Sequence, residues 1–250
     1  MPPLGLHMTI ARDLAIEIAS PRIEADRGAY YLGATTPDIR VLTRWDRERT
    51  HFFRLDEFAR QDCVHRLFAE EPALRDASSL DAATAAFMAG YISHLVMDEA
   101  YICQIYRPMF GAQSDLAEDL MANVMDRLLQ FELDRRDRED AEKIAEIQQA
   151  LAESAVEVSV AFLASDTLER WRHISIEVLA QPPTWDRFAR IASRHLSAIG
   201  VEGEEQFDAF MQQVPTLLSR TMERVGPERI REYLESAKTE ARRALREYLS

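Results

Sequence analysis

Apolar residues recur along the chain at helical spacing, most clearly after Gly111. No Gly or Pro lies between Gly111 and Pro182, which leaves room for very long helices. Within this span the apolar positions alternate steps of three and one: Ala117, Leu120, Met121, Val124, Met125, Leu128 and Leu129. Leu116 extends the same face. This spacing predicts one amphipathic helix, because all of these positions share a face at 3.6 residues per turn.

The few Gly and Pro residues indicate where other helices begin and end. Pro182-Pro183-Thr184 interrupts the chain, and we expect Thr184 to cap a helix that ends at residues 200–203. Gly226-Pro227 ends a further helix and opens the last one. That last segment mixes Arg and Glu at close spacing up to Ser250, which is typical of a solvated amphipathic helix.

Other segments are predicted from their polar residues. Asp166 and Glu169 fit a capping box that opens a helix. The charged run 134–140 is interpreted as solvated helix or as a helix junction. Two regions look irregular, residues 21–53 and the stretch around 108–113, and long loops in a compact helical protein often carry function.

These patterns predict an all-α protein, a multi-helix bundle that forms a single domain over residues 1–250. Hydrophobic residues make up 47% of the 250 residues and charged residues 29%, the balance of a globular protein with a sizeable core. The net charge of -13 argues against general nucleic-acid binding, which needs a basic surface.

The sequence also narrows the expected compartment. The two cysteines, Cys63 and Cys103, form no CxxC pair, so neither a disulfide framework nor a thiolate zinc site is indicated. Charged residues interrupt the first twenty positions, unlike a signal peptide, and no run of about 18 apolar residues exists. We therefore expect a cytoplasmic protein without integral membrane association, and the sequence leaves its oligomeric state open.

The most specific chemical motif is His94-x-x-x-Asp98. On a helix, residues four apart lie on one face with Cβ atoms about 5–6 Å apart, so the pair can hold one cation together. Apolar neighbours on most sides predict that this helix is central and buried: Phe87, Met88, Ile92, Leu95, Val96 and Ile102. A buried imidazole and carboxylate need partners, and either a metal ion or a salt bridge would supply one.

Three other residues extend this motif. His7 directly precedes the first apolar helical face, Asp38 follows Pro37 in a turn-forming segment, and His51 is followed by two Phe residues. Each has a plain structural interpretation: a polar helix start, a helix cap and a hydrogen-bonded core histidine. Together with His94 and Asp98, they predict a metal site of mixed imidazole and carboxylate ligands, which suit zinc and also iron or manganese.

The order of these motifs resembles a known family. Leu6-His7, then Leu-Gly-x-x-x-Pro-Asp, then Thr-His-Phe, then Gly-Tyr-x-x-His-Leu-x-x-Asp are similar to the zinc-dependent phospholipase C family, in particular its intracellular bacterial branch, over about residues 1–110. For the remainder, residues 111–250, the sequence predicts only helices. The resemblance implies a principal zinc site of four ligands, with Asp98 bridging to a second metal that also uses His7. The four implied ligands are Asp38, His51, His94 and Asp98.

The sequence departs from the family after Asp98. Six residues precede His7, so the free amino-terminal ligand of the secreted members is in doubt, and the later histidine ligands of the family are missing. Only His173 and Glu177 form another H-x3-E pair. Apolar neighbours suggest that this pair is buried, where it would join the metal site or form a structural hydrogen bond.

The resemblance implies a metal-dependent hydrolase that uses a metal-bound water to attack a phosphoester, either a phospholipid or a small phosphorylated metabolite, with Asp38 as ligand and candidate base. A non-catalytic metal-binding or regulatory protein that keeps the fold is the alternative. An iron or manganese phosphohydrolase of the HD group is a third, against which the absence of its adjacent His-Asp dipeptide counts. His65 and His195 are expected at helix surfaces or ends, and Trp45, Trp171 and Trp185 as packing anchors.

Overall fold

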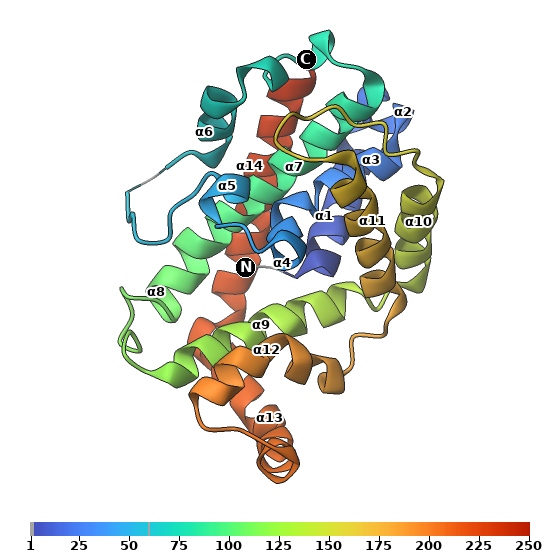
Figure 1. Cartoon of the computed structure of the whole chain (residues 1–250). Coiled ribbons are helices and arrows are strands. Elements are labelled where there is room, and N and C mark those ends of the chain that lie inside the picture. Colours follow the sequence, from blue (N-terminus) through green and yellow to red (C-terminus); the bar gives the residue numbers. More distant parts are fainter. Residues whose placement is uncertain (1–2, 60) are drawn as a thin grey trace.

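The computed structural model describes residues 3–59 and 61–250, and this part of the chain is helical without strands (Figure 1). The predicted all-α fold is therefore confirmed. The α-helices are α1 (Leu4–Ile18), α2 (Pro21–Ala25), α3 (Arg27–Gly33), α4 (Arg40–Thr43), α5 (Glu48–His51), α6 (Cys63–Glu70), α7 (Ala82–Tyr101), α8 (Arg107–Met109), α9 (Leu120–Asp137), α10 (Ala141–Glu153), α11 (Ser165–Ala180), α12 (Trp185–Ala198), α13 (Glu204–Val225) and α14 (Pro227–Leu249). Short 3-10 turns η1 (Thr36–Ile39), η2 (Pro72–Leu74) and η3 (Ala77–Ser79) and a π-helical turn η4 (Ile102–Tyr106) lie between them.

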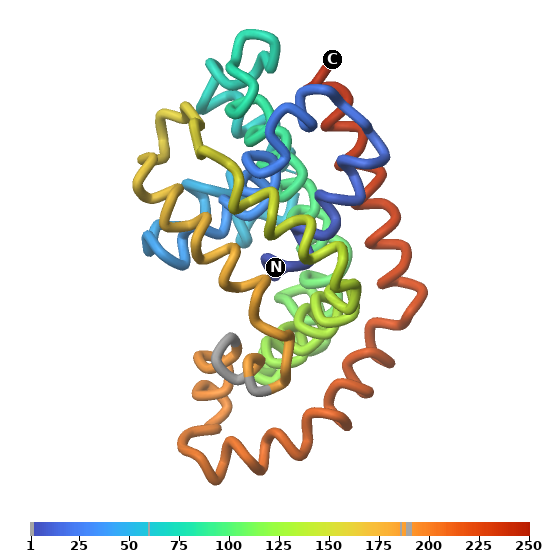
Figure 2. The backbone as a smooth tube through the Cα atoms, turned by 90° about the vertical axis from the view of Figure 1, so that its right-hand side faces the viewer, coloured from blue at the N-terminus to red at the C-terminus, as the bar shows by residue number. Residues whose placement is uncertain are grey.

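Helix α7 is the centre of the molecule. Its N-terminus is capped by Asp81, whose carboxylate accepts the backbone N–H of Thr84. Nearly all of its later residues are buried, as expected for a helix that is apolar on most sides. It packs against α1, α2, α3, α6 and α14. Both views show the long helix α14 running beside it (Figures 1 and 2). Helices α9, α12 and α13 lie toward the end of the molecule that is away from α2 and α6 (Figure 1).

Helices α3 and α7 cross at very short range because each carries a glycine at the crossing. A Cβ atom at Gly33 would collide with the backbone carbonyl of Phe87, and one at Gly90 with the carbonyl of Tyr30. The crossing therefore excludes side chains on both helices. It brings the C-terminal end of α3 directly over the middle of α7.

The segment 21–53, expected to be irregular, is instead a series of short helices, so that expectation is wrong. Ser20 caps α2 by accepting the N–H of Arg22, and Asp26 caps α3 by accepting that of Ala29. These helices have four to seven residues, too few to establish a recognisable apolar period. The second expected irregular stretch does contain turns, between α8 and α9.

Three helix boundaries also differ from the expectations. Helix α9 begins at Leu120 behind the cap Asp119, so Leu116 and Ala117 precede it. The following span is broken at residues 154–164 without Gly or Pro, and within the break Val156 adopts a left-handed backbone with φ of 54°. The expected capping box is wrong, since α11 begins at Ser165 behind Ala164, which has no side chain able to cap. Thr184 does stand at the start of α12, but its side chain makes no capping bond.

The charged run 134–140 spans the junction of α9 and α10, as one interpretation had it, but it is not solvated throughout. Asp134 and Arg138 are buried and lie 3.3 Å apart as an ion pair. Both act on distant elements: Asp134 accepts the N–H of Leu6, and Arg138 donates to the carbonyls of Val178, Leu179 and Gln181. This pair therefore joins α9 to the start of α1 and the end of α11.

We predict that Gly90→Ala destabilises the protein by about 2–3 kcal/mol, the cost of forcing extra volume into a tight contact. Urea denaturation followed by circular dichroism measures this. Replacing a glycine inside a helix by Ala normally increases the free energy of unfolding by about 1 kcal/mol. Unchanged or increased stability in the variant would therefore contradict the close crossing.

Candidate metal centre

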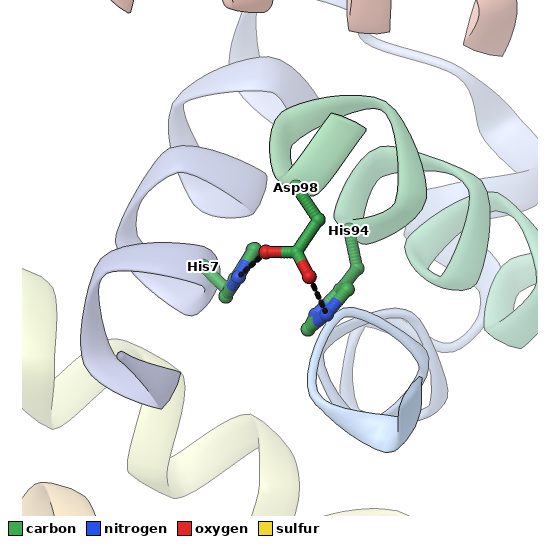
Figure 3. Close-up of side chains that lie close together, drawn as sticks. All are labelled: His7, His94 and Asp98. Atoms are coloured by element: carbon green, nitrogen blue, oxygen red, sulfur yellow. Dashed lines mark ion pairs between the residues drawn. The ribbon is translucent and has the colours of Figure 1, made fainter. Parts of the chain in front are cut away.

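The carboxylate of Asp98 is the centre of the candidate site. Figure 3 shows it between His7 and His94, with one oxygen facing each ring. Its Oδ1 lies 3.3 Å from His7 Nε2, and its Oδ2 lies 3.7 Å from His94 Nε2. His51 Nε2 is 3.2 Å from the same Oδ2 and 3.5 Å from Oδ1 of Asp38.

Five residues from four elements thus meet in the interior, as the motif order suggested. His7 comes from α1, Asp38 from η1, His51 from α5, and His94 and Asp98 from α7. Among the described residues they make two overlapping groups whose ligand atoms lie within 4.8 Å of one another, one of His7, His94 and Asp98 and one of Asp38, His51 and His94. His94 belongs to both.

The orientation of His94 is fixed by the glycine-lined crossing. Its Nδ1 lies 2.8 Å from the carbonyl oxygen of Ala34, at the end of α3. A carbonyl only accepts, so Nδ1 carries a proton and donates it to Ala34, and Nε2 is the ring nitrogen that faces Asp98. A backbone carbonyl on the outer nitrogen is the usual arrangement behind a metal-binding histidine.

His51 is oriented by its neighbour in the chain. The hydroxyl oxygen of Thr50 lies 3.0 Å from His51 Nδ1 and 3.4 Å from the carbonyl oxygen of Arg47. This contact leaves Nε2 of His51 facing the carboxylates of Asp38 and Asp98. The carbonyl of Thr50 accepts the phenol of Tyr91 on α7, which ties this short helix to the central one.

His7 and Asp38 are held by the second half of the chain. Asp134 accepts the N–H of Leu6 next to His7, and the absence of a side chain at Gly5 lets that carboxylate approach. On the other side, Trp171 Nε1 donates to the hydroxyl of Thr35, just before η1. The predicted role of Trp171 as a packing anchor fits its complete burial.

The burial of these groups changes their pKa values in directions that suit ligands. The neighbouring histidines outweigh burial and hold the pKa of Asp98 well below its ordinary value and that of Asp38 at about 2. Burial, together with His94 nearby, lowers the pKa of His7 to about 4. The two carboxylates are therefore anionic and His7 is neutral at neutral pH. Burial lowers the pKa of His94, but Asp98 and Asp38 outweigh burial and raise it, which favours a second proton on the ring. A bound cation would displace this proton.

The arrangement fits a metal ion by an independent observation. The Nε2 atoms of His7, His51 and His94 are all buried and none has a hydrogen-bond partner among the described residues. Leaving such groups unpaired normally costs about 1–3 kcal/mol each. A tetrahedral zinc ion with ligand bonds of about 2.0–2.1 Å holds neighbouring ligand atoms about 3.3–3.4 Å apart, close to the 3.2–3.7 Å separations found here.

Arg47 is a member of this site that sequence reasoning missed. Its Nη2 donates to Asp98 Oδ2 at 2.9 Å. The two residues are 51 positions apart, so no local spacing connects them. The only signal is that Arg47 lies four residues before His51, within an arginine-rich stretch.

The structure does not bring His173 and Glu177 into the site, and their expected burial is wrong. On α11 the face that turns inward carries Trp171 and Ser175, four residues apart, and residues two positions further point the opposite way. The His173 side chain is 61% exposed and pairs with Glu169 instead. His65 is exposed and His195 half-buried, in agreement with their expected peripheral positions.

Comparison with known proteins finds a family match for the first part of the chain. Residues 6–99 match the model of a family described as zinc dependent phospholipase C, which confirms the resemblance over that range. The matched range contains all five ligand candidates and Arg47, and it ends before α8. No curated protein and no solved structure shows significant similarity to the chain.

We predict that His94→Ala and Asp98→Ala each reduce bound metal to less than about a tenth of an equivalent, because each removes a ligand at the centre of the cluster. Elemental analysis of protein purified without chelator measures this. His65→Ala and His195→Ala are the controls and should keep the metal content of the unmodified protein. Equal content in all four variants would locate the metal elsewhere.

Proposed function

We propose that the protein is a metal-dependent hydrolase that acts on a phosphoester and that zinc is its metal, with iron or manganese also suited to the same ligands. The main observation behind this proposal is that three buried histidine Nε2 atoms surround the Asp98 carboxylate without a hydrogen-bond partner among the described residues. The match to a zinc-dependent family over residues 6–99 supports the same metal and reaction class. When bound, zinc would supply a water acidified toward neutral pH and positive charge for the phosphate oxygens.

The exposure of the five candidate ligands suggests how their roles in the reaction would differ. The side chains of His7, His51, His94 and Asp98 are at most 2% exposed, whereas that of Asp38 is 13% exposed. Substrate and solvent therefore approach from the side of Asp38. With a pKa of about 2, Asp38 is a weak proton acceptor. Its best-supported role is as a ligand that also orients the attacking water through its second oxygen.

A lipid phosphoester is the favoured substrate over a small phosphorylated metabolite. Five large apolar side chains are strongly exposed among the described residues, and three of them lie within the segment that supplies Asp38, Arg47 and His51 or shortly after it. They are Val41, Leu55 and Phe58, between 48% and 64% exposed. Exposed apolar side chains beside a polar site can contact acyl chains while the headgroup enters. No helix in the described part of the chain is long and apolar enough to span a membrane.

The alternative, a non-catalytic metal-binding or regulatory protein, rests on one specific observation. The first histidine after Asp98 is His173, and it lies exposed on the outer face of α11. The family's further histidine ligands therefore have no counterpart in the cluster. The two functions differ in hydrolysis rather than in metal binding, so the experiments must measure both.

We predict that the protein purifies with zinc and that chelation lowers both its melting temperature and its hydrolysis of phosphodiesters. At free zinc a hundred-fold above Kd, binding stabilises the folded state by about 2.7 kcal/mol, which raises Tm by about 5–10 °C for a domain of this size. Calorimetry and a screen of phosphomonoesters, phosphodiesters and short-chain phospholipids measure the two effects. A zinc-loaded protein that hydrolyses none of them would favour the non-catalytic alternative.

We further predict that His7→Ala keeps one metal ion but lowers kcat at least about a hundred-fold, since a second cation held by His7 and Asp98 would contribute several kcal/mol to the transition state. The four other candidates, Asp38, His51, His94 and Asp98, would supply the four ligands of a zinc site without His7. Metal stoichiometry and kcat are measured on the same sample. Full activity in this variant would rule out a second catalytic cation at His7.

A further inference from the structure

Among the described residues, Arg47 has more buried side-chain atoms without a hydrogen-bond partner than any other charged residue. Its side chain is 10% exposed, and its Nη2 reaches Asp98. Its Nε and Nη1 atoms are buried and have no hydrogen-bond partner among the described residues. A guanidinium offers five N–H groups in a planar fork, so most of its donors here are uncommitted.

The electrostatics of the cluster indicate what those donors would bind. Asp38 and Asp98 are the two carboxylates among the candidate ligands, and the two positive charges of one divalent cation would balance two carboxylates. Arg47 then leaves the loaded site with a net positive charge in a poorly solvated position. Such a site attracts an anion, and the planar fork of Arg matches the oxygens of a phosphate.

Position supports the same interpretation. Arg47 and Asp38 are the two members of the cluster that solvent reaches, and they come from neighbouring segments, the turn before α5 and η1. Arg47 shares one oxygen of Asp98 with two ligand candidates, since His51 and His94 lie 3.2 and 3.7 Å from the same oxygen that it contacts. With its side chain 10% exposed, Arg47 lies at the edge of the cluster that solvent reaches.

We propose that Arg47 is the oxyanion-binding residue of this site: its guanidinium keeps one hydrogen bond to Asp98 and donates its uncommitted N–H groups to a phosphate group beside the metal. This rests on the proposed metal site. Arg47 would thus link substrate to ligand, since the same side chain that orients Asp98 also contacts the phosphate. The shared chemistry is a phosphate oxyanion, whether on a lipid headgroup or on a soluble ester.

The experiment titrates inorganic phosphate into zinc-loaded protein by calorimetry and measures zinc content on the same samples. Arg47→Met should keep its zinc and bind phosphate at least about ten-fold more weakly, the loss of a hydrogen bond to a charged group. Arg47→Lys keeps the charge without the fork and should lose about three- to five-fold. The matched control is Arg49→Met, whose guanidinium lies 3.7 Å over the Trp45 ring, away from the carboxylates, and it should bind phosphate normally.

Normal phosphate affinity in zinc-loaded Arg47→Met overturns the proposal. So does a parallel loss of zinc and phosphate in both Arg47 variants, which would make Arg47 only a support for Asp98. If the unmodified protein binds no zinc, the proposed function fails by itself. The phosphate titration of the metal-free protein then decides the role of Arg47, because binding that depends on Arg47 supports it and no binding overturns it. Parallel titrations with glycerol 3-phosphate and a short-chain phosphatidylcholine distinguish a soluble ester from a lipid headgroup. The ligand whose affinity falls more in Arg47→Met is the one whose phosphate Arg47 contacts.

Discussion

The burial of one carboxylate, that of Asp98, is the constraint on which the rest of the structure depends. An ionised carboxylate removed from water costs several kcal/mol unless charge and hydrogen bonds compensate it. Three imidazoles and one guanidinium surround it, and besides its own helix they come from α1 and from α5 with its preceding turn. Every one of those elements must therefore be held in place, and their supports account for much of the architecture.

The supports follow a common principle, since His94 and His51 are each oriented by a hydrogen-bonding group outside the cluster. The carbonyl of Ala34 orients His94, and this requires the close crossing of α3 and α7. The hydroxyl of Thr50 orients His51. Both leave Nε2 facing the carboxylates without a hydrogen-bond partner among the described residues, and a buried polar atom in that state costs stability. A bound cation would offset this cost, which is why we interpret the interior as a metal site.

The parts that the sequence predicts are those with short-range causes. His94 and Asp98 are four residues apart on an apolar helix, so their shared face and their burial follow from helix geometry. Arg47 could not be predicted because its contact to Asp98 depends on how η1, α4 and α5 fold, and those helices are too short to have a period. The burial of His173 was predicted wrongly for a related reason. Its apolar neighbours suggested burial, but the inward face of α11 is the one that carries Trp171 and Ser175, and His173 lies on the other face.

The chemistry and its support lie in different halves of the chain. The family match ends at residue 99 and already includes every residue of the two groups that could hold a metal ion. Yet Asp134 holds the start of α1 beside His7, Trp171 and Ser175 hold Thr35 before η1, and α14 covers α7. Without these contacts, the start of α1 would lose the partner of its Leu6 N–H, and the central helix would expose an apolar face. We infer that residues 1–250 fold as a single unit, because a chain ending near residue 110 would keep the ligands but lose the geometry that makes them a site.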